Sequence, residues 1–245
     1  MQLRGRLIAV GLITLCVGLV TMFPARVAYQ WFAPPGISLE GISGSIWSGR
    51  VARADIQGFY LQDISWRIKP LGLLRAKLAY ALEAEPASGF INANAYFGVT
   101  GTIRLEDLQA SLALQSVEQL AGVPGLRGNV NLQFERIVVA DGLPVAANGE
   151  LAVANLVAPL IHRGSIGGYR AEFFTQDTGV LASVVDTDGV VDIAGSFEIA
   201  ADRSYQFLAQ LAPKAETPDN LRSQMRFLGT PNDRGQYELR LEGQL

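Results

Sequence analysis

The stretch Gly41–Val51, GISGSIWSGRV, holds three glycines and three serines around one tryptophan, and residues of these types can do chemistry. It could be a phosphate-binding loop, a serine nucleophile on a tight turn, or a strand interrupted by glycines. A nucleophilic serine needs a base, but His162 is the only histidine and the chain contains no G-x-S-x-G motif. The usual glycine-rich phosphate motifs are also absent. We therefore interpret Gly41–Val51 as a strand in which Gly44 and Gly49 permit bends and Trp47 is a packing residue.

The sequence predicts neither a metal site nor a disulfide. Cys16 is the only cysteine, so neither an intramolecular disulfide nor a cysteine-based metal site can form. Asp186–Asp192, DTDGVVD, is similar to the start of a calcium-binding loop, but it lacks the third ligand position before the glycine and the terminal glutamate. We interpret this segment as a turn, and we predict no catalytic, cofactor-binding or metal-binding residue.

The composition indicates a folded chain without a basic surface. Of its 245 residues 49% are hydrophobic, which allows one large domain or two small ones to bury a core. The net charge is −3 and the lysines and arginines are scattered, whereas nucleic-acid binding depends on clustered positive charge. We therefore expect no nucleic-acid partner.

An uncharged apolar run of 17 residues, Leu7–Phe23, is the strongest feature of the sequence. As a helix it would be about 26 Å long, which is short for a bilayer but sufficient. The alternative is a cleaved signal peptide, but the run is long for one and no A-x-A cleavage pattern follows it. The predicted membrane anchor contains Leu7, Ile8, Leu12, Leu15, Val17, Leu19, Val20 and Phe23.

The charges beside this run predict its orientation. Arg4 and Arg6 precede it, whereas only Arg26 follows closely. The positive-inside rule then leaves the N-terminus in the cytoplasm. We expect residues 1–30 to form a short cytoplasmic end and a single inner-membrane anchor. Residues 31–245 would form a β-rich domain, which is periplasmic if the source is a Gram-negative bacterium.

Beyond Trp31 apolar and polar residues alternate along many segments. The clearest apolar sets are Ile91, Ala93, Ala95 and Phe97; Val130, Leu132 and Phe134; Val191, Ile193, Phe197 and Ile199; and Tyr237, Leu239 and Leu241. A period of two predicts strands with one apolar and one polar face, which is typical of antiparallel sheet. Asp141-Gly142 and Asp188-Gly189 suit hairpin turns.

We therefore predict a mainly β fold, with about a dozen strands in one large antiparallel sheet. So much one-sided sheet exposes more apolar surface than a soluble monomer tolerates. The sheet must then curve, fold over on itself, or be covered by a partner or by lipid. The apolar face mixes small with large residues, among them Ala93, Ala95, Ala209, Phe97, Phe197 and Phe207, so we expect a curved or folded sheet.

Only one or two short helices are expected. The best marked is TPDNLRSQMRFLGTP, in which Thr217 is the expected N-cap and Gly229 ends the helix. A G-x-P-x-x-R-G pattern begins at Gly229 and also at Gly122, and its fixed residues are Gly122, Pro124, Arg127 and Gly128, and Gly229, Pro231, Arg234 and Gly235. We interpret the repeat as two related halves, each with a helix end, a turn and a strand start, and with equivalent environments for the two arginines.

Three segments resemble a known family. ISGSIWSGRV is followed about twenty residues later by ISWRIKPLGLLRAKL, and the chain closes with LGTPNDRGQYELRLEGQL. These segments are similar to the type II secretion system protein N family, whose motif positions are matched by Trp47, Gly49, Trp66, Pro70, Leu73 and Leu74. The resemblance implies a bitopic inner-membrane accessory protein of the machinery that exports folded proteins across the outer membrane. It implies no catalytic residue, and its partners would be other components of that machinery.

Three functions are compatible with these patterns. The first is a structural component of the secretion apparatus whose periplasmic sheet docks on other components. The second is an AsmA-like envelope protein that binds or bridges lipid along the apolar face of the sheet. A hydrolase ranks far behind because the chain offers no base for a serine nucleophile. The alternating pattern does not distinguish the docking function from the lipid-binding function, because both need a sheet with one apolar face.

Overall fold

The computed structural model describes residues 11, 18–33, 36–56, 58–70, 78–86, 88–98 and 101–244. Most of the predicted anchor, namely Leu7, Ile8, Leu12, Leu15 and Val17, lies outside these residues. Within the described part of the chain, no helix is long and apolar enough to cross a membrane.

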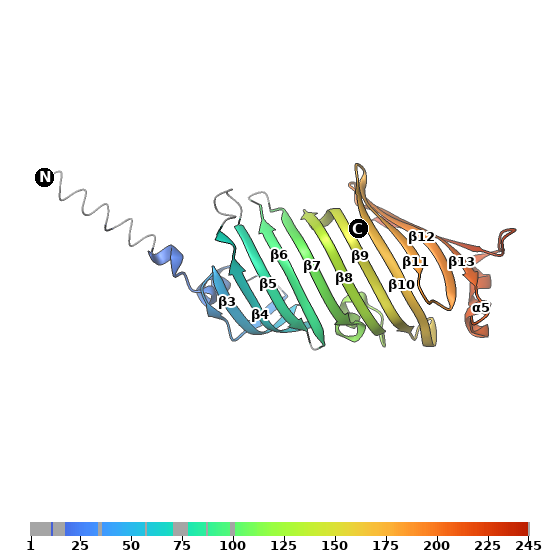
Figure 1. The fold of residues 1–245 in the computed structure, drawn as a ribbon, viewed down its shortest axis with the longest axis horizontal. Helices are drawn as coiled ribbons and strands as arrows, with labels where there is room; N and C mark the ends of the chain where they lie inside the picture. Colours follow the sequence, from blue (N-terminus) through green and yellow to red (C-terminus); the bar gives the residue numbers. More distant parts are fainter. Residues whose placement is uncertain are drawn as a thin grey trace.

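The described residues form one open antiparallel sheet of fourteen strands, which confirms the predicted mainly β fold with one large antiparallel sheet (Figure 1). From β3 onward each strand pairs with the next one in the chain, and β1 and β2 both pair with β3. The strands are β1 Ile37–Glu40, β2 Ser43–Gly44, β3 Ser48–Ile56, β4 Phe59–Ile68, β5 Leu78–Pro86, β6 Gly89–Phe97, β7 Ile103–Ala113, β8 Arg127–Ala140, β9 Leu143–Ala158, β10 His162–Gln176, β11 Gly179–Asp186, β12 Val191–Ala200, β13 Ser204–Pro213 and β14 Tyr237–Gln244.

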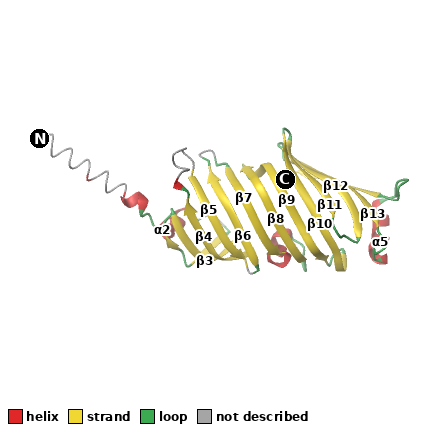
Figure 2. Ribbon diagram, in the orientation of Figure 1, coloured by secondary structure: helices red, strands yellow, loops and turns green. Residues whose placement is uncertain are grey.

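Short helices lie at the start of the sheet and in two of its connections (Figure 2). They are α2 Ala25–Phe32, η1 Leu114–Val117 with α4 Glu118–Ala121, and α5 Asp219–Met225 with η2 Arg226–Leu228. Helix α5 is the one predicted after Thr217, and it buries Leu221 and Met225 as its spacing requires. These helices are too short to cover the whole sheet.

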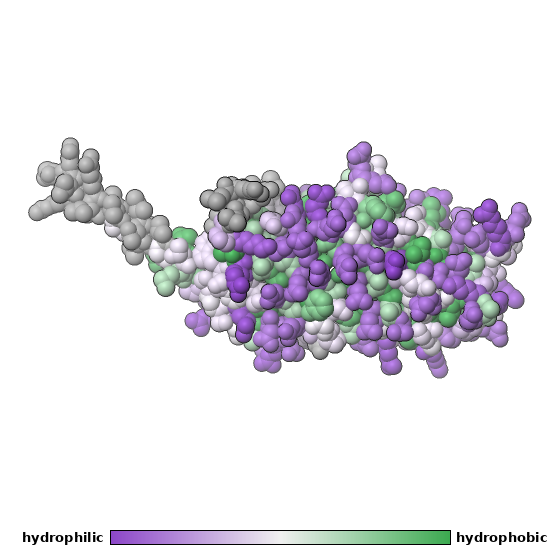
Figure 3. Space-filling model, in the orientation of Figure 1, coloured by the Kyte–Doolittle hydropathy of each residue, from purple (hydrophilic) through white to green (hydrophobic). Residues whose placement is uncertain are grey.

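The sheet has an apolar inner face and a polar outer face. We define the inner face as the one on which η1 and α5 pack, because Leu114 and Leu221 belong to buried clusters with strand residues. In Figure 2, η1 and α4 lie behind the strands, so the view shows the outer face. Hydrophilic side chains predominate over β5–β8 on that face (Figure 3).

Bulges keep the apolar residues on the inner face. Leu61 and Ile64 are three positions apart in β4, yet both contact the same buried cluster. Asp63 lies between them with a φ of 45°, and the pairing with β5 shifts at this point. Asp107, with a φ of 52°, lies at a similar shift between β6 and β7. One extra residue per strand reverses the alternation, so apolar residues of opposite parity share one face.

The sheet curls over β8–β13. Asp141-Gly142 forms the two-residue turn between β8 and β9, with φ positive at both residues as a type I′ turn requires. In a flat sheet this turn would lie about 19 Å from the β12–β13 turn, four strand spacings away. Instead Arg203 of the β12–β13 turn donates a hydrogen bond to the Asp141 carbonyl at 3.2 Å. The predicted curvature is therefore present, and it is concentrated in this half.

The repeated pattern has a similar local structure in its two copies, with one difference. Helix α4 ends at Gly122 before β8, and η2 ends at Gly229 before β14. However, Arg127 is the first residue of β8, whereas Arg234 lies in the turn before β14. The two arginines therefore differ in backbone position, and the equivalence of their environments stays a prediction. The other residues of the pattern lie in the turns or at the strand starts: Pro124, Gly128, Pro231 and Gly235. The relation between two halves stays a prediction.

Candidate functional site

One continuous row of side chains crosses the inner face from β3 to β14, and we call it the inner row. Its members face each other across neighbouring strands, with a bulge between the fourth and the fifth: Gly49, Trp66, Leu82, Ala93, Leu108, Phe134, Gly149, Phe173, Ala182, Phe197, Phe207 and Leu241. Every member is apolar. The row therefore offers a continuous hydrophobic surface and no reactive group.

Small residues in the inner row make room for aromatic rings. Phe134 contacts Phe173 with ring centroids 5.2 Å apart, and Gly149 lies between them on β9. A methyl group added at Gly149 would lie 2.7 Å from Cδ1 of Phe134. Gly49 has the same relation to Trp66, because its methyl group would lie 2.8 Å from Cη2 of the indole. The alternation of small and large residues is thus a packing requirement.

Gly149→Ala is expected to lower the free energy of unfolding by about 1–3 kcal/mol, because the added methyl group overpacks Phe134 and the backbone beside it. Gly142→Ala is the matched control, since Gly142 also has a positive φ but nothing lies within 4 Å of an added methyl group. Thermal melts of both variants separate the steric cost from the backbone cost. Equal destabilisation of the two would show that the contact with Phe134 has no effect.

The inner face is covered only in part. Helix η1 lies over one cluster, in which Leu112, Leu114 and Val130 are buried. Helix α5 covers a second cluster, in which Ile166, Val191, Leu211, Leu221 and Met225 are among the buried residues. Among the described residues no large side chain is completely buried. The clusters are therefore shallow, and the inner row relies on its own curvature for burial.

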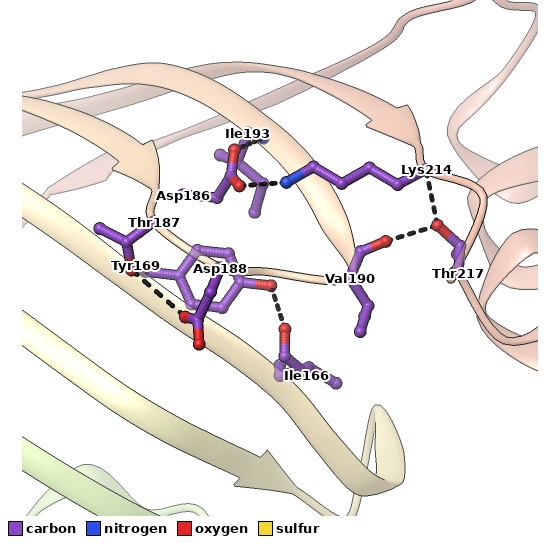
Figure 4. A network of polar contacts seen from close by, with 9 residues as sticks. All are labelled: Ile166, Tyr169, Asp186, Thr187, Asp188, Val190, Ile193, Lys214 and Thr217. Carbon is purple, nitrogen blue, oxygen red and sulfur yellow. Dashed lines mark hydrogen bonds and ion pairs between the residues drawn. The ribbon is translucent and has the colours of Figure 1, made fainter.

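A polar network attaches α5 to the curled half of the sheet (Figure 4). Lys214 forms an ion pair with Asp186 at the end of β11, and its backbone N–H donates to Thr217 Oγ1 at 2.7 Å. The buried Thr217 hydroxyl donates to the Val190 carbonyl. The predicted capping role of Thr217 is therefore wrong, since its hydroxyl is engaged with the β11–β12 connection. The network fixes the segment that precedes α5.

The carboxylates of this network have opposite pKa shifts. Burial raises the pKa of Asp186, but hydrogen bonds from Lys214 and from the Ile193 N–H outweigh it, so the pKa lies below the ordinary value. The hydrogen bond to Asp186, together with burial, raises the pKa of Asp192. Burial and the nearby aspartates raise the pKa of Tyr169 to about 12, so its hydroxyl stays protonated and donates to the Ile166 carbonyl at 2.9 Å.

We expect Asp192→Asn to raise the melting temperature at pH 7 and to have no such effect near pH 3. A group whose pKa is raised on folding stabilises the protein only when it is protonated, and this contribution is lost as the pH rises through the folded pKa. The amide of asparagine can donate to Asp186 as the protonated carboxyl does. Melts between pH 3 and pH 8 would test this, and an unchanged melting temperature at pH 7 would contradict it.

Asp186→Asn is the matched variant, and we expect it to change the melting temperature in the opposite direction. The pKa of Asp186 is lowered on folding, so its contribution is present above the unfolded pKa of about 3.9 and is lost as the pH falls. We expect this variant to lower the melting temperature at pH 7 and to approach the wild type near pH 3. A deficit that does not depend on pH would show that packing, not charge, accounts for it.

The glycine-rich stretch Gly41–Val51 forms a small hairpin, not one strand. Strands β2 and β3 pair with each other, and Ser45–Trp47 connects them. The Ser45 hydroxyl accepts hydrogen bonds from the N–H groups of Trp47 and Ser48, at 3.2 and 3.3 Å, and so closes a turn that the sequence interpretation missed. The prediction of a strand is therefore confirmed only near the two ends of this segment, and its middle is a turn.

The two motif tryptophans have different environments. Trp66 packs against the cluster around Val51 and Leu61, and its indole N–H donates to the Ser45 carbonyl at 3.1 Å. Trp47 lies in the turn, is half-buried, and donates its indole N–H to the Val20 carbonyl at 2.7 Å. Pro70 is exposed just after β4, and the motif residues Leu73 and Leu74 lie outside the described residues.

The histidine does not belong to a reactive group. His162 begins β10, and its Nδ1 lies 3.1 Å from Asn220 Nδ2 of α5. Among the described residues no group of three or more histidine, cysteine, aspartate or glutamate side chains is placed to hold a metal ion. The fold and the inner row thus define a class: an open-sheet β protein with a continuous apolar face.

Comparison with known proteins identifies the family. A family described as "Type II secretion system (T2SS), protein N" matches residues 35–240. The chain is 27% identical over 240 residues to a type II secretion system protein N of Aeromonas hydrophila, and the match covers 93% of each chain. It is 27% identical over 239 residues to the protein of the same name of Vibrio cholerae serotype O1, with 94% of each chain covered. No solved structure matches the chain.

The chain therefore belongs to the type II secretion system protein N family. This membership supports an accessory role in type II secretion, in which the protein works with other proteins of the system. The family is one of secretion components and is not known as a family of enzymes, in agreement with the resemblance found in the sequence.

Proposed function

We propose that the protein is a single-pass inner-membrane component whose β-domain lies in the periplasm and docks on other secretion proteins through the outer edge of β14. The observation that carries this proposal is the free edge of the sheet. Within the described part of the chain β14 is bonded to β13 alone, and most of its residues are exposed. An unpaired edge strand can accept a strand from another protein. The charged residues Glu238, Arg240 and Glu242 would restrict this pairing to a complementary partner.

The docking edge is tested by photo-crosslinking in cells that express the complete secretion system. A benzoylphenylalanine placed at Glu242 is expected to cross-link to another secretion component. The same group placed at Ser88, in the distant turn between β5 and β6, serves as the control and is expected to give no such product. The absence of any secretion component among the Glu242 products would overturn docking through this edge.

The anchoring proposal is supported by the apolar run Leu7–Phe23 and the arginines before it. Alkaline phosphatase fused after Leu245 is expected to be active, because it would be carried across the inner membrane with the β-domain. The N-terminus of the mature protein is expected at or next to Met1. An N-terminus near Ala28 would show that the run is a cleaved signal peptide.

A second candidate function is the binding of lipid by the inner row. The observation in its favour is that the inner face is covered only in part, and that Phe97, Ile103 and Leu241 on this face remain exposed. Native mass spectrometry of the full chain in detergent would count bound phospholipids. Stoichiometric phospholipid that survives washing and is lost in Phe207→Asn would favour lipid binding over docking. A lipid-free protein that co-purifies with secretion components would favour docking.

A further inference from the structure

Exposed apolar side chains lie at the end of the predicted anchor and in the helix that follows it, and we call them the collar. Its members are Leu19, Val20, Met22, Trp31 and Phe32, with 62, 55, 78, 67 and 77% of their surface exposed. All five lie within fourteen residues of sequence. Leu19, Val20 and Met22 belong to the end of the apolar run Leu7–Phe23, and Trp31 and Phe32 follow it. Single exposed apolar residues are ordinary, but here Trp31 contacts the rings of both Phe23 and Phe32, and exposed apolar residues that gather in this way mark an interaction surface.

Helix α2 has one side that packs on the protein and an end that carries the collar residues Trp31 and Phe32. Ala25 and Tyr29, one turn apart, lie against the protein: Ala25 is buried, and the Tyr29 hydroxyl donates to the Ile37 carbonyl at 2.9 Å. It also accepts a hydrogen bond from the Leu39 N–H at 3.2 Å. Trp31 is turned away from this side and contacts Phe23, with ring centroids 5.6 Å apart. One side of α2 is therefore attached to β1, while its end presents aromatic rings outward.

The glycine-rich hairpin holds the chain that leaves the apolar run. The Trp47 indole donates to the Val20 carbonyl at 2.7 Å, and the Ile46 N–H donates to the Phe23 carbonyl at 3.0 Å. Pro24 and Ser45 form an isolated β-bridge next to these bonds. Three backbone positions around the collar are thus tied to the first edge of the sheet. The end of the apolar run is therefore bonded directly to the hairpin of the β-domain.

We propose that the collar is seated at the boundary between acyl chains and headgroups, where the apolar run leaves the bilayer, and that it holds the β1–β3 edge of the sheet at the membrane surface. This inference rests on the proposed membrane anchor. Tryptophan and other aromatic rings favour the membrane interface, and a short amphipathic helix buries its apolar side at the boundary between headgroups and acyl chains. The collar includes the end of the apolar run, and the polar residues Arg26 and Gln30 are exposed on α2 where headgroups can contact them. These features favour a phospholipid surface over a second protein.

Spin labels report the depth of the collar. In the full chain with Cys16→Ser, the variant Phe32→Cys carries a nitroxide, and Phe227→Cys is the control because Phe227 is 89% exposed in η2 at the opposite end of the sheet. Both proteins are reconstituted into vesicles of phosphatidylethanolamine and phosphatidylglycerol. The label at position 32 is expected to be accessible to oxygen and protected from a water-soluble nickel complex, and the label at position 227 is expected to behave in the opposite way.

Failure of the collar proposal can be distinguished from failure of the anchor proposal. A protein that resists carbonate extraction while its label at position 32 is exposed to the nickel complex would overturn the collar proposal alone. Release of the protein by carbonate would overturn the anchor and the collar together. Trp47→Phe in the Phe32→Cys background removes the indole donor, and it is expected to increase the mobility of the label without releasing the protein. Unchanged mobility would show that the bond to Val20 does not hold the collar.

Discussion

Trp66→Ala is expected to lower the free energy of unfolding by about 3 kcal/mol, at the lower end of the range for a large aromatic residue because the side chain is only partly buried. For a domain of this size such a loss lowers the melting temperature by about 6–12 °C. The indole fills the space above Gly49 and packs on the cluster around Val51 and Leu61. Its loss also leaves the Ser45 carbonyl without a donor. Thermal melts of the full chain in detergent would measure the effect.

Trp47→Ala is the informative comparison. Trp47 lies outside the buried clusters, and its indole bonds to Val20. We therefore expect the fold to persist in this variant, with a smaller shift in melting temperature than in Trp66→Ala. This expectation differs from the sequence-based interpretation, in which Trp47 is a packing residue within a strand. A larger loss in Trp47→Ala than in Trp66→Ala would reverse the two roles.

Alternation predicts most of this fold because burial on one face dictates the sequence of each strand. Val130, Leu132 and Phe134 lie on the inner face of β8 as their spacing requires. The side chains that form the inner row could therefore be assigned strand by strand. Which of these side chains lie opposite each other on neighbouring strands could not be predicted. The register between strands depends on turns and bulges that alternation alone does not fix.

The bulges coincide with a signal in the sequence. In β4 the apolar positions change parity between Leu61 and Ile64, and Asp63 stands at the change. Aspartate tolerates a positive φ better than most residues, so a change of parity beside an aspartate marks a bulge. The role of Thr217 had no comparable signal, since its acceptor Val190 is 27 residues away in sequence. Such contacts depend on the curl of the sheet.

Phe134→Ala is expected to cost about 3–5 kcal/mol of the free energy of unfolding, more than Trp66→Ala, because Phe134 is only 7% exposed. Its ring packs against Phe173 and lies in one buried cluster with Val180, although β8 and β11 are three strands apart in the sheet. The ring therefore belongs to a cluster that extends over four strands of the curled half of the sheet. Its removal is expected to loosen the curl as well as to leave a cavity.

Phe227→Ala is the control for this prediction, since Phe227 is 89% exposed and its loss is expected to leave the melting temperature unchanged. Hydrogen exchange would then locate the effect of Phe134→Ala. Amides of β8–β12 are expected to exchange faster, while those of β3–β5 keep their protection, because the two regions belong to different buried clusters. An unchanged melting temperature in Phe134→Ala would mean that the rings of the inner row do not pack on each other. The apolar face would then need another cover, and lipid binding would become the stronger explanation for its sequence.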